Sequence, residues 1–232
     1  MTKKNYDIFL LDADDTLFDF PACCKNALRR AMELCNIAYC EDDHEKYMRI
    51  NGGLWKRLER KEITHQDLFE LRFKEFLLQK TGDGTKCAQL NDAYMRCLSQ
   101  ECVSFDGAED FLRELKKRGR ICIITNGTAF VQRGRFKKFG IYRYAEEVFI
   151  SEEIGAYKPS AEYMARVAKN IENFTPQTAL IIGDSLSSDV ALAGNTGIDC
   201  VWFHPQGESS EGGNAVTFEA KSYQAILQFL NR

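Results

Sequence analysis

Acidic residues stand close together directly after the first apolar run of the chain. Residues 6–11 are mostly apolar, and Asp12, Asp14 and Asp15 follow them at once. Two carboxylates separated by one residue can divide the work of phosphoryl transfer. An ionised one attacks phosphorus, while the other protonates the leaving oxygen and later deprotonates water. We predict that Asp12 is the nucleophile and that Asp14 is the acid/base.

This chemistry needs a cation, because two carboxylates would repel an anionic phosphate ester. The formal net charge of the chain is −3, which offers no general attraction for an anion. A divalent cation that bridges carboxylate and phosphoryl oxygens would remove the repulsion, and Mg²⁺ prefers oxygen ligands. Taken alone, however, an acidic run also fits a helix cap or a solvated turn.

A second apolar run ends in residues that suit a phosphoryl group. Residues 120–125 end in Thr125, and Asn126 and Gly127 follow. They offer a hydroxyl, an amide and backbone N–H groups, and glycine allows the backbone to approach a phosphoryl group closely at a helix start. The three residues alone also fit a simple strand-to-helix turn.

A third apolar run, residues 178–182, leads through a glycine to Asp184. Asp189 follows about one helical turn later, and both carboxylates are suitable ligands for a metal ion. Lys158 is a candidate to bind the phosphate and to offset the charge on Asp12. Singly, Asp184 also fits a helix cap, and Lys158 fits an ordinary surface lysine.

The elements that position these residues are short apolar strands separated by amphipathic helices. This alternation predicts an α/β fold built on a doubly wound parallel sheet, in which the strands deliver polar residues at one edge. Besides the three runs above, the pattern predicts the following elements: weaker strands at 147–150 and 199–203, a helix at 106–118, a helix capped by Ser160, a polar loop at 207–214 and a last helix at 223–230.

The segment between the first strand and residue 106 has a helical period and no convincing strand. It includes two helical stretches, at 21–35 and 64–80. We therefore predict two domains, with these boundaries: an α/β core of residues 1–17 and 105–232, and an inserted helical cap of residues 18–104.

Composition narrows the class of protein further. The chain has 232 residues, 44% of them hydrophobic, which is typical of a folded protein with a sizeable core. Asp12 interrupts the first apolar run too early for a signal peptide, and no run reaches membrane-spanning length. The nine cysteines form no paired framework, which favours reduced thiols in the cytoplasm. We expect no membrane or nucleic-acid polymer as a partner, and a monomer or a homodimer.

Together and in this order, the four features resemble the motifs of the haloacid dehalogenase (HAD) superfamily. These motifs are D-x-D-x-T at residues 12–16, a Ser or Thr after a strand, a Lys, and GD-x-x-x-x-D at residues 183–189. The resemblance covers essentially the whole chain. The helical insert is placed as in members of the superfamily that have a C1-type cap.

The resemblance implies a ligand set for magnesium. Asp12 and Asp184 would supply carboxylates, and Asp14 would supply its backbone carbonyl. Asp189 would support this set of metal ligands. It also implies that Thr125 binds the phosphate.

Asn126 and Lys158 would bind the same phosphate in this resemblance, and Gly127 would lie against it. The true dehalogenases lack an acid/base Asp two residues after the nucleophile, so Asp14 favours phosphoryl transfer over cleavage of a carbon–halogen bond. A phosphomutase, and a binding module that keeps the fold without catalysis, remain as alternatives.

Residues of the insert are similar to the pyrimidine 5'-nucleotidase branch of the superfamily. Trp55 and Phe73 are candidates to stack on a base, and Arg72 is a candidate to meet a polar base or sugar edge. Packing in the cap explains them equally well. The expected substrate is a small phosphomonoester, specifically a pyrimidine nucleoside monophosphate, with phosphoglycolate and sugar phosphates as alternatives.

Overall fold

Two compact units make up the chain in the computed structural model, which describes residues 4–205, 213 and 215–231. One unit contains the sheet and comprises residues 1–19, 104–132 and 139–232. The other is helical and comprises residues 20–103 and 133–138. Nearly all of the polar loop expected at 207–214 lies outside the described residues.

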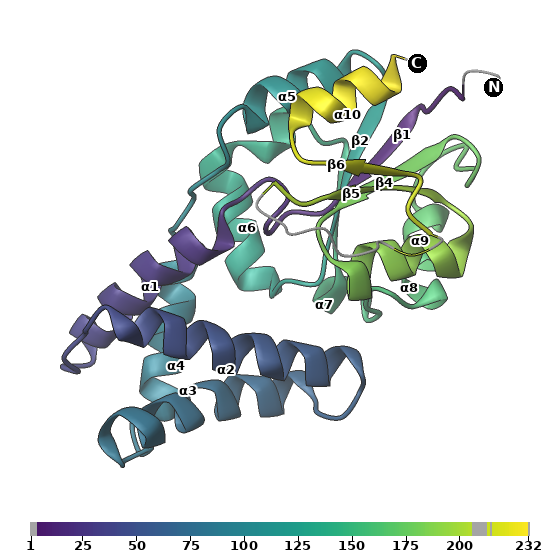
Figure 1. Ribbon diagram of the computed structural model, residues 1–232. Helices are drawn as coiled ribbons and strands as arrows, with labels where there is room; N and C mark the ends of the chain where they lie inside the picture. Colours follow the sequence, from purple (N-terminus) through teal and green to yellow (C-terminus); the bar gives the residue numbers. More distant parts are fainter. Residues whose placement is uncertain (1–3, 206–212, 214, 232) are drawn as a thin grey trace. The chain divides into compact units, whose positions relative to one another are not determined.

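Six parallel strands form the sheet, in the order β3-β2-β1-β4-β5-β6 (Figure 1). The strands are β1 (Ile8–Leu11), β2 (Arg120–Thr125), β3 (Glu147–Ile150), β4 (Ala179–Gly183), β5 (Asp199–Phe203) and β6 (Phe218–Ala220). The predicted doubly wound α/β fold is confirmed. Along the chain, β1 to β3 follow one another toward one edge of the sheet, whereas β4 to β6 follow one another toward the opposite edge. The direction of winding therefore reverses between β1 and β4.

Helices cover both faces of the sheet, which explains why its central strands are apolar throughout (Figure 1). Ile8 and Leu10 point into a core cluster with Met164 and Val167 of one helix and Leu192 of another. The helices of this unit are α5 (Ala108–Lys116), α6 (Ala129–Phe139, part of which belongs to the helical unit), α7 (Ser151–Ile154), α8 (Ala161–Lys169), α9 (Ala191–Thr196) and α10 (Tyr223–Leu230), with a 3-10 turn η1 (Ile141–Arg143) and a π-helical turn η2 (Leu186–Val190).

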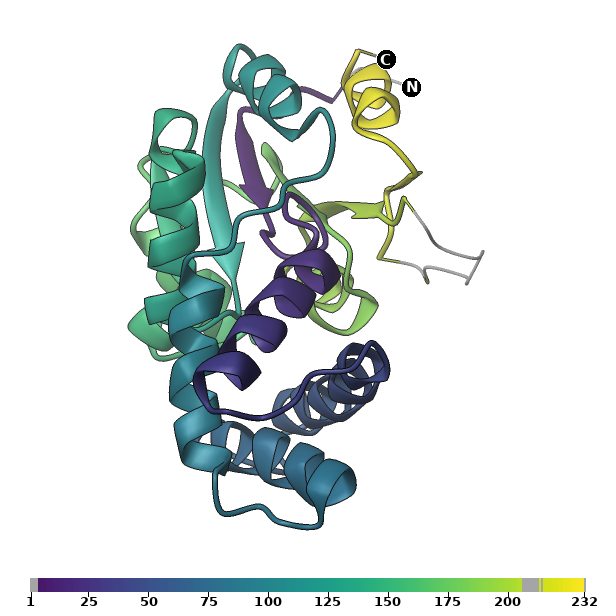
Figure 2. The same ribbon diagram turned by 90° about the vertical axis from the view of Figure 1, so that its left-hand side faces the viewer.

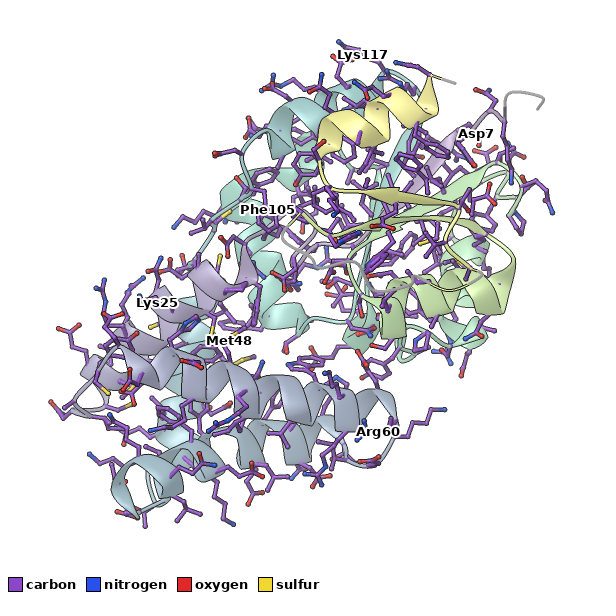
Figure 3. The ribbon with its side chains drawn as sticks, viewed as in Figure 1. Asp7, Lys25, Met48, Arg60, Phe105 and Lys117 are labelled. Atoms are coloured by element: carbon purple, nitrogen blue, oxygen red, sulfur yellow. The ribbon has the colours of Figure 1, made fainter. Side chains whose placement is uncertain are left out.

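Local sequence signals set several element boundaries. The Ser160 side chain accepts the backbone N–H of Tyr163, which confirms the predicted cap of α8. Asp7 and Lys117 precede β1 and β2 at the amino edge of the sheet (Figure 3). The N–H of Arg120 donates to the carbonyl oxygen of Asp7 there, so the two strands start in register.

Four helices and residues 133–138 of α6 build the helical unit, whose helical character the periodicity predicted. The four helices are α1 (Phe20–Leu34), α2 (Asp42–Glu59), α3 (His65–Thr81) and α4 (Cys87–Ser99). α1 packs against α4, and α2 packs against α3 (Figures 1 and 2). Tyr47, Phe73 and Tyr94 form an aromatic centre with ring centroids 5.0–5.2 Å apart. Thr64 and Asp67 form a capping box that begins α3.

Candidate active site

The acidic residues singled out by the sequence lie at the carboxyl edge of the sheet, where the winding reverses. Leu11 of β1 stands level with Ile123 of β2 and Ile182 of β4. Asp12 comes next, and its N–H donates to the carbonyl oxygen of Ile182 at 2.9 Å. Asp184 directly follows β4. Open α/β sheets bind ligands at this kind of reversal point.

Lys158 lies between two of the carboxylates. Its Nζ is 2.6 Å from Asp12 Oδ1, 2.7 Å from Asp189 Oδ1 and 3.0 Å from the carbonyl oxygen of Ile124. The side chains are almost fully buried, with exposed fractions of 2% for Lys158 and 1% for Asp189. The three acceptors match the three donors of an ammonium group, so the position of this charge is fixed.

Burial shapes the electrostatics of this cluster. It raises the pKa of the Asp12 carboxyl to about 7, against the opposing effect of the Lys158 ammonium. Burial and the charges of Asp12 and Asp189 also raise the pKa of Asp184. Burial acts to lower the pKa of Lys158, but the carboxylates of Asp12 and Asp189 outweigh it and raise that pKa. Three carboxyl groups beside one ammonium favour a further cation.

The carboxylates of Asp12, Asp184 and Asp189 can hold a metal ion. One oxygen from each lies within 4.8 Å of the others. A ligand set made only of carboxylate oxygens suits Mg²⁺. The sequence predicted Asp12, Asp14 and Asp184 as ligands with Asp189 in support, whereas the carboxylate of Asp14 turns toward Gln132. For Asp14, the ligand atom that the resemblance implied is the backbone carbonyl, and this hydrogen bond of the carboxylate is compatible with it.

The turn that carries Asp184 is held from three directions. Trp202 Nε1 donates to the carbonyl oxygen of Asp184 at 2.8 Å, and Thr16 Oγ1 lies 3.5 Å from Asp184 Oδ1. The N–H of Ser185 donates to Asp189 Oδ2 at 3.2 Å. A side chain at Gly183 would overlap the carboxyl group of Asp189, so this position requires glycine.

The candidate phosphate ligands lie at the end of β2. Thr125 Oγ1 accepts the N–H of Gly127 at 3.1 Å. Asn126 Nδ2 donates to the carbonyl oxygen of Lys158 at 3.0 Å, and Asn126 Oδ1 accepts the Lys158 N–H at 2.9 Å. Both polar atoms of the Asn126 amide are thus engaged with the backbone of Lys158, which ties that segment to the end of β2.

Gln132 belongs to this site and was missed by the sequence analysis. Its Nε2 donates to Asp14 Oδ2 at 2.8 Å and to Thr125 Oγ1 at 3.0 Å. The available signal was a polar residue in the first turn of the helix that follows the Thr-Asn-Gly segment. That signal is weak, because polar residues are common in helix first turns.

The three cap candidates differ in exposure. Phe73 is fully buried in the aromatic centre of the helical unit, and Trp55 is partly exposed. Arg72 is 4% exposed, and its Nε and Nη2 donate to Asn91 Oδ1 at 3.0 and 2.6 Å. The guanidinium also lies 5.0–5.4 Å from three ring centroids, including that of Phe73. Phe73 and Arg72 thus contribute to packing within this unit.

Within the described part of the chain, no helix is both long enough and apolar enough to cross a membrane.

Comparison with known proteins places the chain in a family. Residues 6–197 match the haloacid dehalogenase-like hydrolases. The chain is also 32% identical to the HAD-hydrolase YfnB of Bacillus subtilis, over 98% of this chain and 97% of that protein. The chain therefore belongs to the haloacid dehalogenase-like hydrolases, and the predicted superfamily is confirmed.

Three further matches extend this result. The structure of YfnB bound to magnesium matches with a TM-score of 0.92 at 32% identity, covering 99% of this chain and 100% of that one. The pyrimidine 5'-nucleotidase PynA of Streptococcus pneumoniae is 33% identical over 98% of this chain and 96% of its own length. The pyrimidine 5'-nucleotidase YjjG of Escherichia coli is 27% identical over 97% and 98%.

Proposed function

We propose that the protein is a magnesium-dependent phosphomonoester hydrolase that works through an aspartyl phosphate at Asp12. The observation that carries this proposal is the buried Asp12 carboxylate, paired with Lys158 at 2.6 Å and lying beside the carboxylates of Asp184 and Asp189. A fixed carboxylate next to a fixed positive charge is suited to in-line attack on phosphorus.

In the first half-reaction, a carboxylate oxygen of Asp12 forms a bond to phosphorus and the bond from phosphorus to the ester oxygen breaks. Asp14 gives its proton to the departing oxygen, which leaves as an alcohol. In the second half-reaction, water attacks the phosphorus of the aspartyl phosphate while Asp14 accepts a proton from it. Orthophosphate leaves, and the Asp12 carboxylate is regenerated.

The oxygen ligands on this edge fit Mg²⁺, which we propose is held by the carboxylates of Asp12 and Asp184 and by the backbone carbonyl of Asp14. Asp189 supports this set and also fixes Lys158. When bound, the ion neutralises charge on the carboxylates and the phosphoryl group, so that one anion can approach another.

The phosphoryl group is bound by Thr125, Gly127 and Lys158 in this proposal. The Thr125 hydroxyl and the backbone N–H groups near the start of α6 are donors, and a helix N-terminus favours an anion. Asn126 takes part by holding the Lys158 segment, because its amide is engaged there.

We propose a pyrimidine nucleoside monophosphate as the substrate, with phosphoglycolate and sugar phosphates as the alternatives. Support comes from the similarity to PynA and YjjG over nearly the whole chain. Of the three cap candidates, Trp55 is the one that is partly exposed, and its aromatic ring is of a kind that can stack on a base. Arg72 and Phe73 would then support the packing of the helical unit that carries Trp55.

The test is phosphate release from a panel of nucleotides, sugar phosphates and phosphoglycolate, with and without Mg²⁺. Asp12→Asn serves as the blank, and Asp110→Asn, an exposed position on α5, serves as the matched control. Preference for pyrimidine monophosphates supports the nucleotidase. Preference for the other esters would contradict the nucleotidase proposal but support the broader proposal of a phosphatase. Isomerised sugar phosphate without phosphate release would establish a phosphomutase instead, and inactivity on every ester would remove the catalytic assignment.

A further inference from the structure

Gln132 is a buried amide at the centre of the site. It lies in the first turn of α6, and only 1% of the residue is exposed to solvent. A buried amide without partners would be costly, so the groups that it contacts matter for the fold and for the chemistry. Its nitrogen contacts Asp14 and Thr125, two residues with proposed roles in the reaction.

The chemistry of the partners fixes the orientation of the amide. A carboxyl oxygen that carries no proton can only accept hydrogen bonds, so Asp14 Oδ2 faces the Gln132 NH₂ at 2.8 Å, and the other oxygen of Asp14 stays available for proton transfer. The second proton of the same nitrogen points to Thr125 Oγ1 at 3.0 Å. One NH₂ group therefore fixes two side chains that come from different strand ends.

This arrangement decides how the Thr125 hydroxyl behaves. Its oxygen accepts one hydrogen bond from Gln132 and a second from the N–H of Gly127 at 3.1 Å. A hydroxyl oxygen has two lone pairs, and both are then in use. The hydroxyl can act toward any further group only as a donor, which is the role that a phosphoryl oxygen requires.

Gly127 makes room for the amide. A Cβ at this position would lie 2.7 Å from both Cγ and Cδ of Gln132 and closer still to Nε2. Contacts this short are excluded, so any side chain at 127 would push the amide away from Asp14 and Thr125. The Thr-Asn-Gly segment thus needs its glycine for a reason beyond the approach of a ligand.

We propose that Gln132 is a positioning residue that orients Asp14 for proton transfer and makes the Thr125 hydroxyl an obligate donor. The proposal rests on the proposed phosphatase function. Gln132 takes part in no bond that forms or breaks. It acts by keeping both groups in place, so its loss should weaken transition-state stabilisation more than substrate binding.

The experiment compares the parent protein with Gln132→Met, which keeps the length of the side chain and removes both donors. We expect kcat to fall about 10- to 100-fold, less than the full contribution of about 10²–10⁴-fold from general acid–base catalysis, because Asp14 itself remains in place. KM should stay within about threefold, whereas the inhibition constant of orthovanadate, a mimic of the transition state, should rise in parallel with the loss of kcat. Gln224→Met, at an exposed position of α10, is the matched control.

Two further measurements separate positioning from a general structural defect. The Mg²⁺ dissociation constant, measured by calorimetry, should change less than about twofold, because both protons of the Gln132 amide nitrogen are directed to Asp14 and Thr125. Thermal unfolding reports whether the variant folds. If Gln132→Met does not fold, Gly127→Ala provides the second variant, since it displaces the amide without removing it.

The outcomes are distinct. A folded Gln132→Met or Gly127→Ala whose kcat and vanadate inhibition match those of an active parent would overturn this inference and leave the phosphatase intact. A parent that releases no phosphate from any ester with Mg²⁺ would overturn the proposed function itself. Loss of kcat with unchanged Mg²⁺ affinity and weakened vanadate inhibition supports the positioning role.

Discussion

Lys158 holds Asp12 by an ion pair of 2.6 Å between residues that are 146 positions apart in the chain. The same ammonium contacts Asp189 at 2.7 Å and the carbonyl oxygen of Ile124 at 3.0 Å. A buried charge of this kind is stable only with all of its partners in place. The pair therefore couples the stability of the core to the geometry of the candidate nucleophile.

Replacing Lys158 by Met should destabilise the protein strongly. It would leave Asp12 and Asp189 buried without their cation, and breaking a buried pair in this way costs about 3–5 kcal/mol. Urea unfolding in EDTA at pH 8 measures the loss, with Lys169→Met as the control because Lys169 is exposed on α8. Equal unfolding midpoints for the two variants would contradict the structural role of the pair.

The stability of the metal-free protein should fall as the pH rises from about 4 to about 7. Burial raises the pKa of Asp12 to about 7 and also raises the pKa of Asp184. Between the unfolded and folded pKa values, the folded state keeps protons that the unfolded state releases. The stabilisation that these two carboxyl groups contribute is therefore complete when the pH is below their pKa in the unfolded state. It is lost as the pH rises through their pKa in the folded state. The free energy of unfolding then falls by up to about 1.4 kcal/mol per pH unit for each proton.

Urea unfolding in EDTA across this pH range measures the slope. Asp12→Asn, which cannot titrate, should flatten it, whereas a neutral substitution at the exposed Asp110 should not. A metal-free parent whose stability rises steadily from pH 4 to pH 7 would show that the two raised pKa values do not govern this range.

Asp14→Asn should lower kcat by about 10²–10⁴-fold, the usual contribution of a general acid–base group. The Mg²⁺ dissociation constant should remain close to that of the parent, because Asp14 Oδ2 accepts from Gln132 and the metal-binding group of carboxylates consists of Asp12, Asp184 and Asp189. Steady-state kinetics and calorimetry check the two halves of the prediction. Loss of Mg²⁺ binding in this variant would mean that the Asp14 carboxylate is itself a ligand.

Gly183→Ala should destabilise the protein by about 1–3 kcal/mol, the usual range for overpacking a dense site. The new methyl group would overlap the carboxyl group of Asp189, which also fixes Lys158. Gly52→Ala is the matched control, because its Cβ would meet no atom within 4 Å and its helix would gain about 0.5–1 kcal/mol. Unfolding midpoints that shift in the same direction for both variants would contradict this prediction.

Trp202→Phe should weaken Mg²⁺ binding by about tenfold, the lower range for groups that support metal ligands. The indole N–H of Trp202 donates to the carbonyl oxygen of Asp184, and the ring stacks on His204 at 3.9 Å. His204 Nε2 in turn lies 2.8 Å from Glu219 Oε1. Calorimetry measures the change, with Trp55→Phe in the helical unit as the control. An unchanged dissociation constant would remove Trp202 from the support of Asp184.

Much of the fold follows from local patterns in the sequence. The bounds predicted for β3, β5 and α10 agree with the structure, because short apolar runs and amphipathic periods mark these elements directly. β6 was not predicted. It has only three residues, and its hydrogen bonds to β5 define it more than any pattern of its own does.

The sequence by itself determined which residues stand at the strand ends, since Asp12, Thr125 and Asp184 each follow an apolar run. It also determined the superfamily, through the order and spacing of the motifs. The sequence also suggested that Lys158 offsets the charge on Asp12, but only the tertiary structure decided the contact of Lys158 with Asp189 and the contacts of Gln132. These contacts join residues far apart in the chain, whose hydrogen bonds depend on the parallel register of the strands and on which side chains the packing buries.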